Sequence, residues 1–179
     1  MNNISPEQAS LFFQTISLPT LKRENATTIQ VIQAIPLDRG DYRPEPVAKT
    51  ALELAWHMAA AEHRFLGGIA AGEFDFAPNN RPDSVRNSAQ LADWYAKSFE
   101  GNFQRLTQMS GDQLIKIIDF RGLFQLPAFT YVQFNVHHII HHRGQLSTYL
   151  RPMGGKVPNI YGESYDGTEA RKAAQAKSA

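Results

Sequence analysis

The chain has 179 residues, of which 42% are hydrophobic and 20% charged, and this composition is typical of a single globular domain with its own core. A formal net charge of +1 and the lack of any Lys- or Arg-rich run argue against nucleic acid or an anionic membrane as the main partner. The sequence contains no cysteine, so it forms no disulfide and can hold a metal only through His, Asp, Glu or water.

The first residues do not resemble a targeting segment. Residues 1–10 are polar and lack a basic stretch followed by an apolar run, as a signal peptide would have. No apolar stretch approaches the roughly 20 residues that are needed to span a bilayer. We therefore expect a cytoplasmic protein without a membrane partner.

The N-terminal part of the chain predicts two helices and a loop. Pro6 suits the first turn of a helix over about 5–17, and Pro19 is expected to interrupt it. Apolar residues at helical spacing then predict a second helix over about 20–34. The Pro- and Gly-containing stretch 36–49 predicts an ordered loop rather than a linker to another domain.

The middle of the chain predicts two longer helices. Apolar residues at helical intervals indicate a helix over about 50–71, with Thr50 as its cap and Gly72 as its stop. Residues 73–87 are loop-like, and a further helix with several aromatic residues is expected over about 88–109.

The last third of the chain begins with a turn predicted at 110–112. The β-branched and aromatic stretch 115–126 predicts either a short hairpin or a strand-like crossover, and the sequence does not decide between them. Pro127 is expected to open the last helix, which would end near residue 153. The tail from about residue 168 has little to bury and is expected to be frayed, or helical only in context.

Four major helical runs joined by long, Pro-containing connections indicate an all-α bundle. The chain shows no internal repeat, so we expect one domain over residues 1–179. Connections of this length need not join antiparallel neighbours, and the sequence pattern therefore leaves the topology open.

The expected last helix holds four of the six histidines of the chain. His138 and His142 are four residues apart and share one face of a helix, at a spacing that suits one metal ion. His137 and His141 form a second pair, rotated by about 100° from the first. A third ligand from another helix, His57, would complete a three-histidine site with an open position, which is typical of catalytic zinc. Periodicity alone does not show that this third histidine faces the last helix.

Other polar and aromatic side chains fall near the face of the first histidine pair. We expect Asn135, Gln145 and Tyr149 to bind or orient a substrate there. From the second pair, His141 is expected to make an outer contact to the metal site. A lone histidine is more often a satisfied core residue than a ligand, and we interpret His63 in that way.

The sequence lacks the motifs of several other kinds of site. There is no His-Glu-x-x-His, no Gly-x-Gly-x-x-Gly, no phosphate-binding loop and no local support for a serine triad. A ferritin-like di-iron site would need Glu-x-x-His on two helices, and neither Glu53 nor Glu62 has a histidine three residues on.

A longer string around the histidines resembles the signature of the DinB family. It runs His138-x-x-His141-His142-Arg143-Gly144-Gln145-Leu146, followed by Tyr149-Leu150-Arg151, Gly154, Val157-Pro158 and Ile160-Tyr161-Gly162. Two upstream segments also resemble that family, one its loop and the other its second helix. They are Asp41-Tyr42-Arg43-Pro44 and Leu52-Glu53-Leu54-Ala55-Trp56-His57-Met58. The similarity spans about 20–165 and leaves a C-terminal tail of about 166–179.

The resemblance implies a four-helix bundle with long crossover connections and one divalent metal ion held by His57, His138 and His142. It also implies that Arg143 makes polar contacts that tie helices together, and that Gly144 lets a neighbouring helix approach closely. Members of the family often form dimers, so we expect a homodimer. The family's name refers to induction by DNA damage, which does not imply DNA binding.

Characterised relatives include metal-dependent transferases that use thiols such as bacillithiol or mycothiol, and a thiol-dependent maleylpyruvate isomerase. Our first hypothesis is therefore an enzyme in which a metal-activated thiolate attacks an electrophilic substrate, with metal-dependent hydrolysis as a variant. The second hypothesis is a non-catalytic, metal-stabilised bundle that binds a small molecule or partner in a stress response. Zinc or nickel suits three imidazoles, and manganese or iron stays open.

Overall fold

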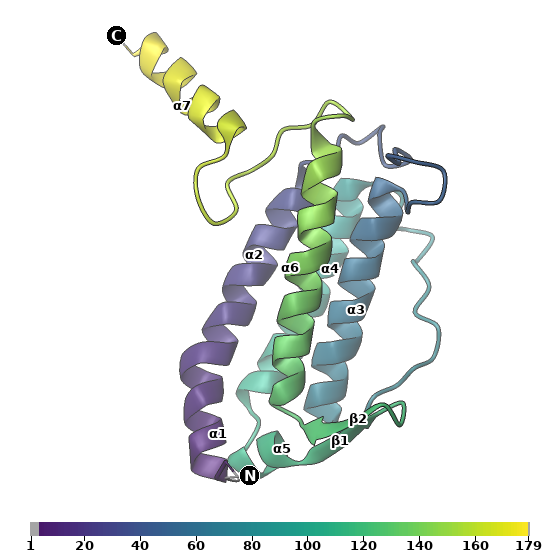
Figure 1. The fold of residues 1–179 in the computed structure, drawn as a ribbon, viewed down its shortest axis with the longest axis vertical. Helices are drawn as coiled ribbons and strands as arrows, with labels where there is room; N and C mark the ends of the chain where they lie inside the picture. The colour runs from purple at the N-terminus through teal and green to yellow at the C-terminus, as the bar shows by residue number, and fades with distance from the viewer. Residues whose placement is uncertain (1–3, 179) are drawn as a thin grey trace.

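The computed structural model describes residues 4–178, and its N-terminal part is one continuous helical rod (Figure 1). Helix α1 (Pro6–Phe12), a π-helical turn η1 (Phe13–Ser17) and helix α2 (Leu18–Gln33) follow one another without a loop. The expected interruption at Pro19 is therefore wrong.

The π-helical turn explains how a helix continues through Pro19. A proline ring clashes with the carbonyl four residues earlier in a regular α-helix, here that of Thr15, and offers no N–H to it. In η1 the spacing widens by one residue, and the N–H of Leu18 bonds to the carbonyl of Phe13. The extra residue in the turn accommodates the proline, and the rod continues.

The loop before the second long helix is ordered, as expected. The backbone N–H of Ala51 donates to the carbonyl of Tyr42 at 2.8 Å, and that of Leu52 donates to Gly40 at 2.9 Å. These two bonds use N–H groups at a helix start, where no helical partner exists, and so hold the loop against the helix.

Helix α3 (Ala51–Ala71) begins and ends at the predicted signals. Thr50 and Glu53 form a reciprocal capping box, and Gly72 adopts the left-handed conformation, with φ of 75°, that closes a helix. The segment 72–87 then returns along the outside of the helices to the start of α4 (Ser88–Thr107) (Figure 1). Helices α3 and α4 consequently run in the same direction, as a long crossover allows.

Between α4 and the last long helix the chain forms a short helix and a hairpin. The predicted turn at 110–112 is instead the start of α5 (Gly111–Ile115), which has its own capping box. The stretch 115–126, for which the sequence left a hairpin and a strand-like crossover open, forms most of an antiparallel hairpin of β1 (Ile117–Phe120) and β2 (Phe124–Pro127). Because Pro127 ends this hairpin, it does not open the following helix, and α6 (Thr130–Leu150) is shorter at both ends than expected.

The C-terminal tail forms helix α7 (Tyr165–Lys177), which starts at a Ser164 cap and contains no buried residue. It projects from the body of the molecule (Figure 1). Within residues 4–178, no helix combines the length and the apolar character that crossing a membrane requires.

The four long helices form the body of the molecule. Helix α3 packs against α6 and α4, and α2 packs against α4 and α6. The structure is mostly helical, and the small hairpin at one end is its departure from the predicted all-α class (Figure 1).

The interior contains two apolar clusters with buried polar residues between them. On α2, Leu21 belongs to one cluster and Val31 to the other, and Glu24 and Thr28 are buried between them. On α3, Glu62 is likewise buried between residues of the two clusters. On α6, the buried polar residues Asn135 and Arg143 lie on either side of His138 and His142 in the sequence.

Candidate metal centre

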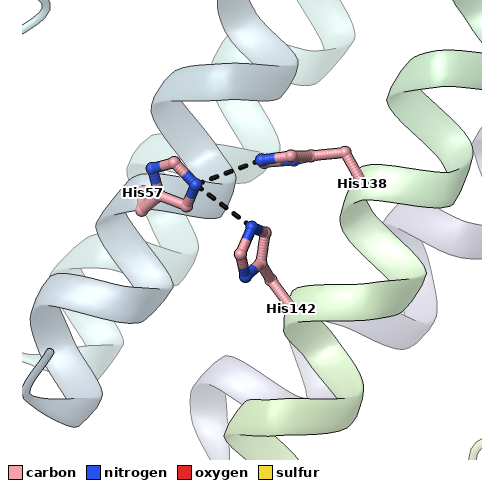
Figure 2. Close-up of side chains that lie close together, drawn as sticks. All are labelled: His57, His138 and His142. Carbon is pink, nitrogen blue, oxygen red and sulfur yellow. Dashed lines mark hydrogen bonds between the residues drawn. The ribbon is translucent and has the colours of Figure 1, made fainter. Parts of the chain in front are cut away.

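Three histidines from two helices meet at one point. His57 projects from α3, and His138 and His142 project from successive turns of α6 toward it (Figure 2). The Nε2 atom of His57 lies 3.1 Å from Nε2 of His138 and 3.2 Å from Nε2 of His142. A ligand atom from each ring lies within 4.8 Å of the other two. The structure thus brings together the three histidines that the sequence singled out.

The short contacts among these nitrogens fit a shared cation better than hydrogen bonds. A neutral imidazole Nε2 carries either a hydrogen or a lone pair, so His57 cannot donate to one neighbour and accept from the other. Two nitrogens that share a tetrahedral zinc ion lie about 3.3 Å apart, given bond lengths of about 2.05 Å. The two observed distances are close to that value, and the donor set therefore fits a small divalent ion.

The surroundings of His57 and His138 favour their neutral form, which a metal ligand must have. Burial, together with the neighbouring His142, His57 and His141, lowers the pKa of His138 from 6.5 to about 4. Burial also lowers the pKa of His57, with smaller contributions from His142 and from the charge of Lys49. In the neutral form, these two rings have a lone pair available for a cation.

Gln145 makes the outer contact to His142. Its Oε1 accepts a hydrogen bond from Nδ1 of His142 at 2.7 Å, and its Nε2 donates to Nε2 of His141 at 3.2 Å. With its hydrogen on Nδ1, the neutral ring of His142 presents the Nε2 lone pair to the other two histidines. Gln145 and His141 therefore lie behind the ligand His142. Gln145 also lines a pocket, so its expected contact with a substrate stays a prediction.

Asn135 lies in the core. It is fully buried, and its Nδ2 donates to Oε1 of Glu62 at 3.0 Å, while Nδ2 of Asn25 donates to the other carboxylate oxygen at 3.3 Å. Burial raises the pKa of Glu62. Asn135 therefore ties α6 to α3 from inside, and its burial leaves it no access to a substrate in a surface pocket.

Two pockets open beside the histidines. One, of about 570 Å³, is lined by His57, and the other, of about 550 Å³, is lined by His142 together with Gln145 and Tyr149. Lys49 lines both pockets. The structure thus places Tyr149, an expected substrate contact, in the wall of a pocket at the site.

Gly144 does not have the role that the family resemblance implied. It is exposed, and a Cβ atom added to it would meet nothing within 4 Å. The expectation that a neighbouring helix approaches closely at Gly144 is wrong. Its small size instead leaves the His142-lined pocket open, because Gly144 is part of that pocket's wall.

Arg143 ties three parts of the chain together behind the site. It is 1% exposed, and it donates to the carboxylate of Glu24 at 2.6 Å and to the hydroxyl groups of Thr28 and Tyr161. Tyr161 in turn donates to Glu24 at 2.7 Å. The helix-tying contacts implied for Arg143 are present, but the sequence did not single out Glu24 as its partner, because an acidic residue in a helix usually faces water.

The remaining histidines lie outside the centre. His137 is exposed on α6. His63 is also exposed, and its Nδ1 lies 2.6 Å from Oγ of Ser98 and 3.1 Å from Nδ2 of Asn102. It is satisfied by hydrogen bonds, as expected, but it is not a core residue.

Comparisons of the sequence with known proteins point in the same direction. The chain matches the DinB family model over residues 13–174. It is 27% identical over 136 residues to the uncharacterized protein YjoA of Bacillus subtilis strain 168, an overlap of 75% of this chain and 86% of that protein. It is 35% identical over 112 residues to the uncharacterized protein YrdA of the same organism, covering 61% of this chain and 64% of YrdA.

Solved structures share the fold. The crystal structure of the DinB-like protein YjoA from Bacillus subtilis has a TM-score of 0.69 and 23% identity, covering 82% of this chain and 98% of that chain. That of a DinB-like protein from Bacillus cereus has a TM-score of 0.69 and 24% identity, covering 81% of this chain and 95% of the other. At these identities the likeness concerns the fold alone.

Proposed function

This chain belongs to the DinB family, and from that membership and its three converging imidazoles we propose that it binds one divalent metal ion through His57, His138 and His142. The observation that carries the proposal is the approach of three Nε2 atoms to within bonding reach of one small ion. Zinc or nickel is the expected metal, with manganese or iron as alternatives.

The fold is proposed to be a DinB-like four-helix bundle with long crossover connections. The mutual packing of α2, α3, α4 and α6 supports this, as does the long return of the chain between α3 and α4. In such an arrangement the ligands come from two rigid helices, so the centre is held by the packing of the body rather than by loops.

We propose that the protein is a metal-dependent transferase that uses a low-molecular-weight thiol and an electrophilic substrate. When bound, the ion would supply positive charge that favours the deprotonated form of a thiol. The chain itself supplies two pockets, one at His57 and one at His142, which suits a reaction between two substrates. Gln145 holds the ring of His142 in one tautomer, and Tyr149 lines the second pocket, where it would contact a substrate.

Metal content per chain, measured by elemental analysis, tests the centre. His57→Ala, His138→Ala and His142→Ala are each expected to lose the ion that the wild type holds. His63→Ala is the matched control, because His63 lies on the same helix as His57 but bonds to Ser98 and Asn102 instead. Full occupancy in His138→Ala, or equal loss in the His63→Ala control, would overturn the assignment.

Activity of the metal-loaded protein tests the reaction. Thiol donors are paired with electrophiles, and simple esters and amides are assayed alongside for hydrolysis. Turnover that needs both a thiol and the three histidines supports the transferase. Turnover of esters alone points to a hydrolase. If there is no turnover but the metal raises the melting temperature strongly, the protein is a metal-stabilised binding protein in a stress response.

We further propose that the chain forms a homodimer, as the family resemblance led us to expect, and that it is cytoplasmic. Exposed apolar side chains on the N-terminal rod, Leu11, Phe12 and Ile16, offer area for self-association. Sedimentation of the purified chain would show a mass of two chains if the proposal holds.

A further inference from the structure

The pocket lined by His57 has a wall built from the crossover segment. Arg64 on α3 donates to the carbonyls of Asp75 and Ala77 at 3.1 and 2.8 Å. Nε1 of Trp56 donates to the carbonyl of Asn79 at 3.3 Å. These bonds hold residues 75–79 against α3, so the pocket is a feature of the packed chain and not a gap beside a loose loop.

The charge in this pocket is strongly one-sided. Three cationic side chains line it, those of Lys49, Arg64 and Arg81, against a single carboxylate, that of Glu53. Arg64 is engaged by backbone carbonyls, and Glu53 caps α3 through the backbone N–H of Thr50 at 2.8 Å. Across residues 4–178, no hydrogen bond or ion pair engages Lys49 or Arg81.

Two cationic side chains that line the same pocket and make no hydrogen bond or ion pair within the described part of the chain are suited to an anionic ligand. Guanidinium and ammonium groups bind carboxylate and phosphate through charge-assisted hydrogen bonds, which are among the strongest in proteins. The pocket volume of about 570 Å³ lies within the range of small-molecule sites. Trp56 and Ala60 add an apolar surface for the carbon part of such a ligand.

We propose that Lys49 and Arg81 hold the anionic group, carboxylate or phosphate, of a small substrate in this pocket. His57 lines the same pocket, so the rest of the bound molecule lies beside one of the three histidines. This inference rests on the proposed function, in which the three histidines form a metal centre. It adds that the substrate is a small anion. The pocket selects a small acid over its neutral amide.

The test is equilibrium binding of two simple probes, succinate and inorganic phosphate, with succinamide as the neutral analogue of succinate. Titration calorimetry measures the affinity, and the emission of Trp56 in a Trp94→Phe variant reports whether the probe enters this pocket. The full chain is used both as purified and after metal removal. The metal-free arm matters because succinate and phosphate can themselves bind a metal ion.

We expect saturable binding of succinate or phosphate to wild type, with the tighter of the two identifying the anion, and no matching affinity for succinamide. Lys49→Gln and Arg81→Gln should each weaken binding about tenfold, as expected for one lost charge-assisted contact. Lys22→Gln, which removes an exposed lysine outside the pocket, should change nothing.

Several results would overturn the inference. They are the absence of saturable anion binding, equal affinity for succinamide, and unchanged affinity in both pocket variants. These results are separable from the metal proposal, because the metal-free arm does not depend on the ion. If the chain takes up no metal even when zinc is added, yet binds anions in a way that depends on Lys49 and Arg81, the metal centre is refuted and the anion pocket stands.

Discussion

The contact between Gln145 and His142 leads to a quantitative prediction for metal affinity. Replacing Gln145 with Ala removes the acceptor of the 2.7 Å hydrogen bond from Nδ1 of His142. A neutral hydrogen bond contributes about 0.5–1.5 kcal/mol, and outer contacts of metal-bound histidines are worth about 10–100-fold in affinity. The two ranges meet near tenfold, or about 1.4 kcal/mol, which is the loss we expect.

The assay is competition for zinc between the protein and a chromophoric chelator at fixed pH and ionic strength. Gln145→Glu keeps an acceptor and adds a negative charge, so it should bind zinc at least as tightly as wild type. Gln133→Ala serves as control, because Gln133 lies on the same helix and, among the described residues, makes no hydrogen bond to a histidine. A Gln145→Ala affinity within about twofold of wild type would refute the view that this bond orients the ligand.

Two further predictions concern stability. Arg143→Met should lower the free energy of unfolding in urea by about 3–5 kcal/mol, because the Glu24 carboxylate, 3% exposed, would lose its guanidinium. The double variant Glu24→Leu, Arg143→Met should recover most of that loss, and equal losses in the single and double variants would contradict the ion-pair argument. In metal-free protein the pKa of His138 is about 4, below the ordinary 6.5. Between these two pH values the unfolded chain therefore binds more protons than the folded protein does. The contribution of His138 to stability should therefore rise with pH from about 4 to 6.5 and then level off. Melting temperatures across this window should rise less steeply in His138→Gln, and identical slopes would count against the shifted pKa.

Local signals in the sequence were sufficient for much of the secondary structure. Thr50 and Gly72 mark the ends of α3 because a capping oxygen and a left-handed glycine act on the nearest backbone groups. The pairing of His138 with His142 was equally local, since four residues make about one helical turn. These features depend on chain geometry within a few residues, which a sequence displays directly.

At two prolines the local sequence signals predicted the wrong structure. Pro19 lies inside a helical rod because a π-helical turn makes room for its ring. Pro127 was expected at a helix start but ends a strand that is paired with β1. At Pro127 the outcome depended on strand pairing beyond the neighbouring residues, which overrode a local preference. At Pro19 a local change of helix spacing was sufficient.

What only the tertiary structure decided is which faces of the helices meet. Periodicity assigns residues to a face but does not state the rotation of one helix against another, which packing of the whole core settles. The meeting of His57 with α6 and the burial of Asn135 against Glu62 follow from that rotation. The pocket that Lys49 shares with Arg81 follows from the crossover segment, which folds back against α3. The sequence by itself determined the family, the main helices and the histidine pair, and packing completed the site around them.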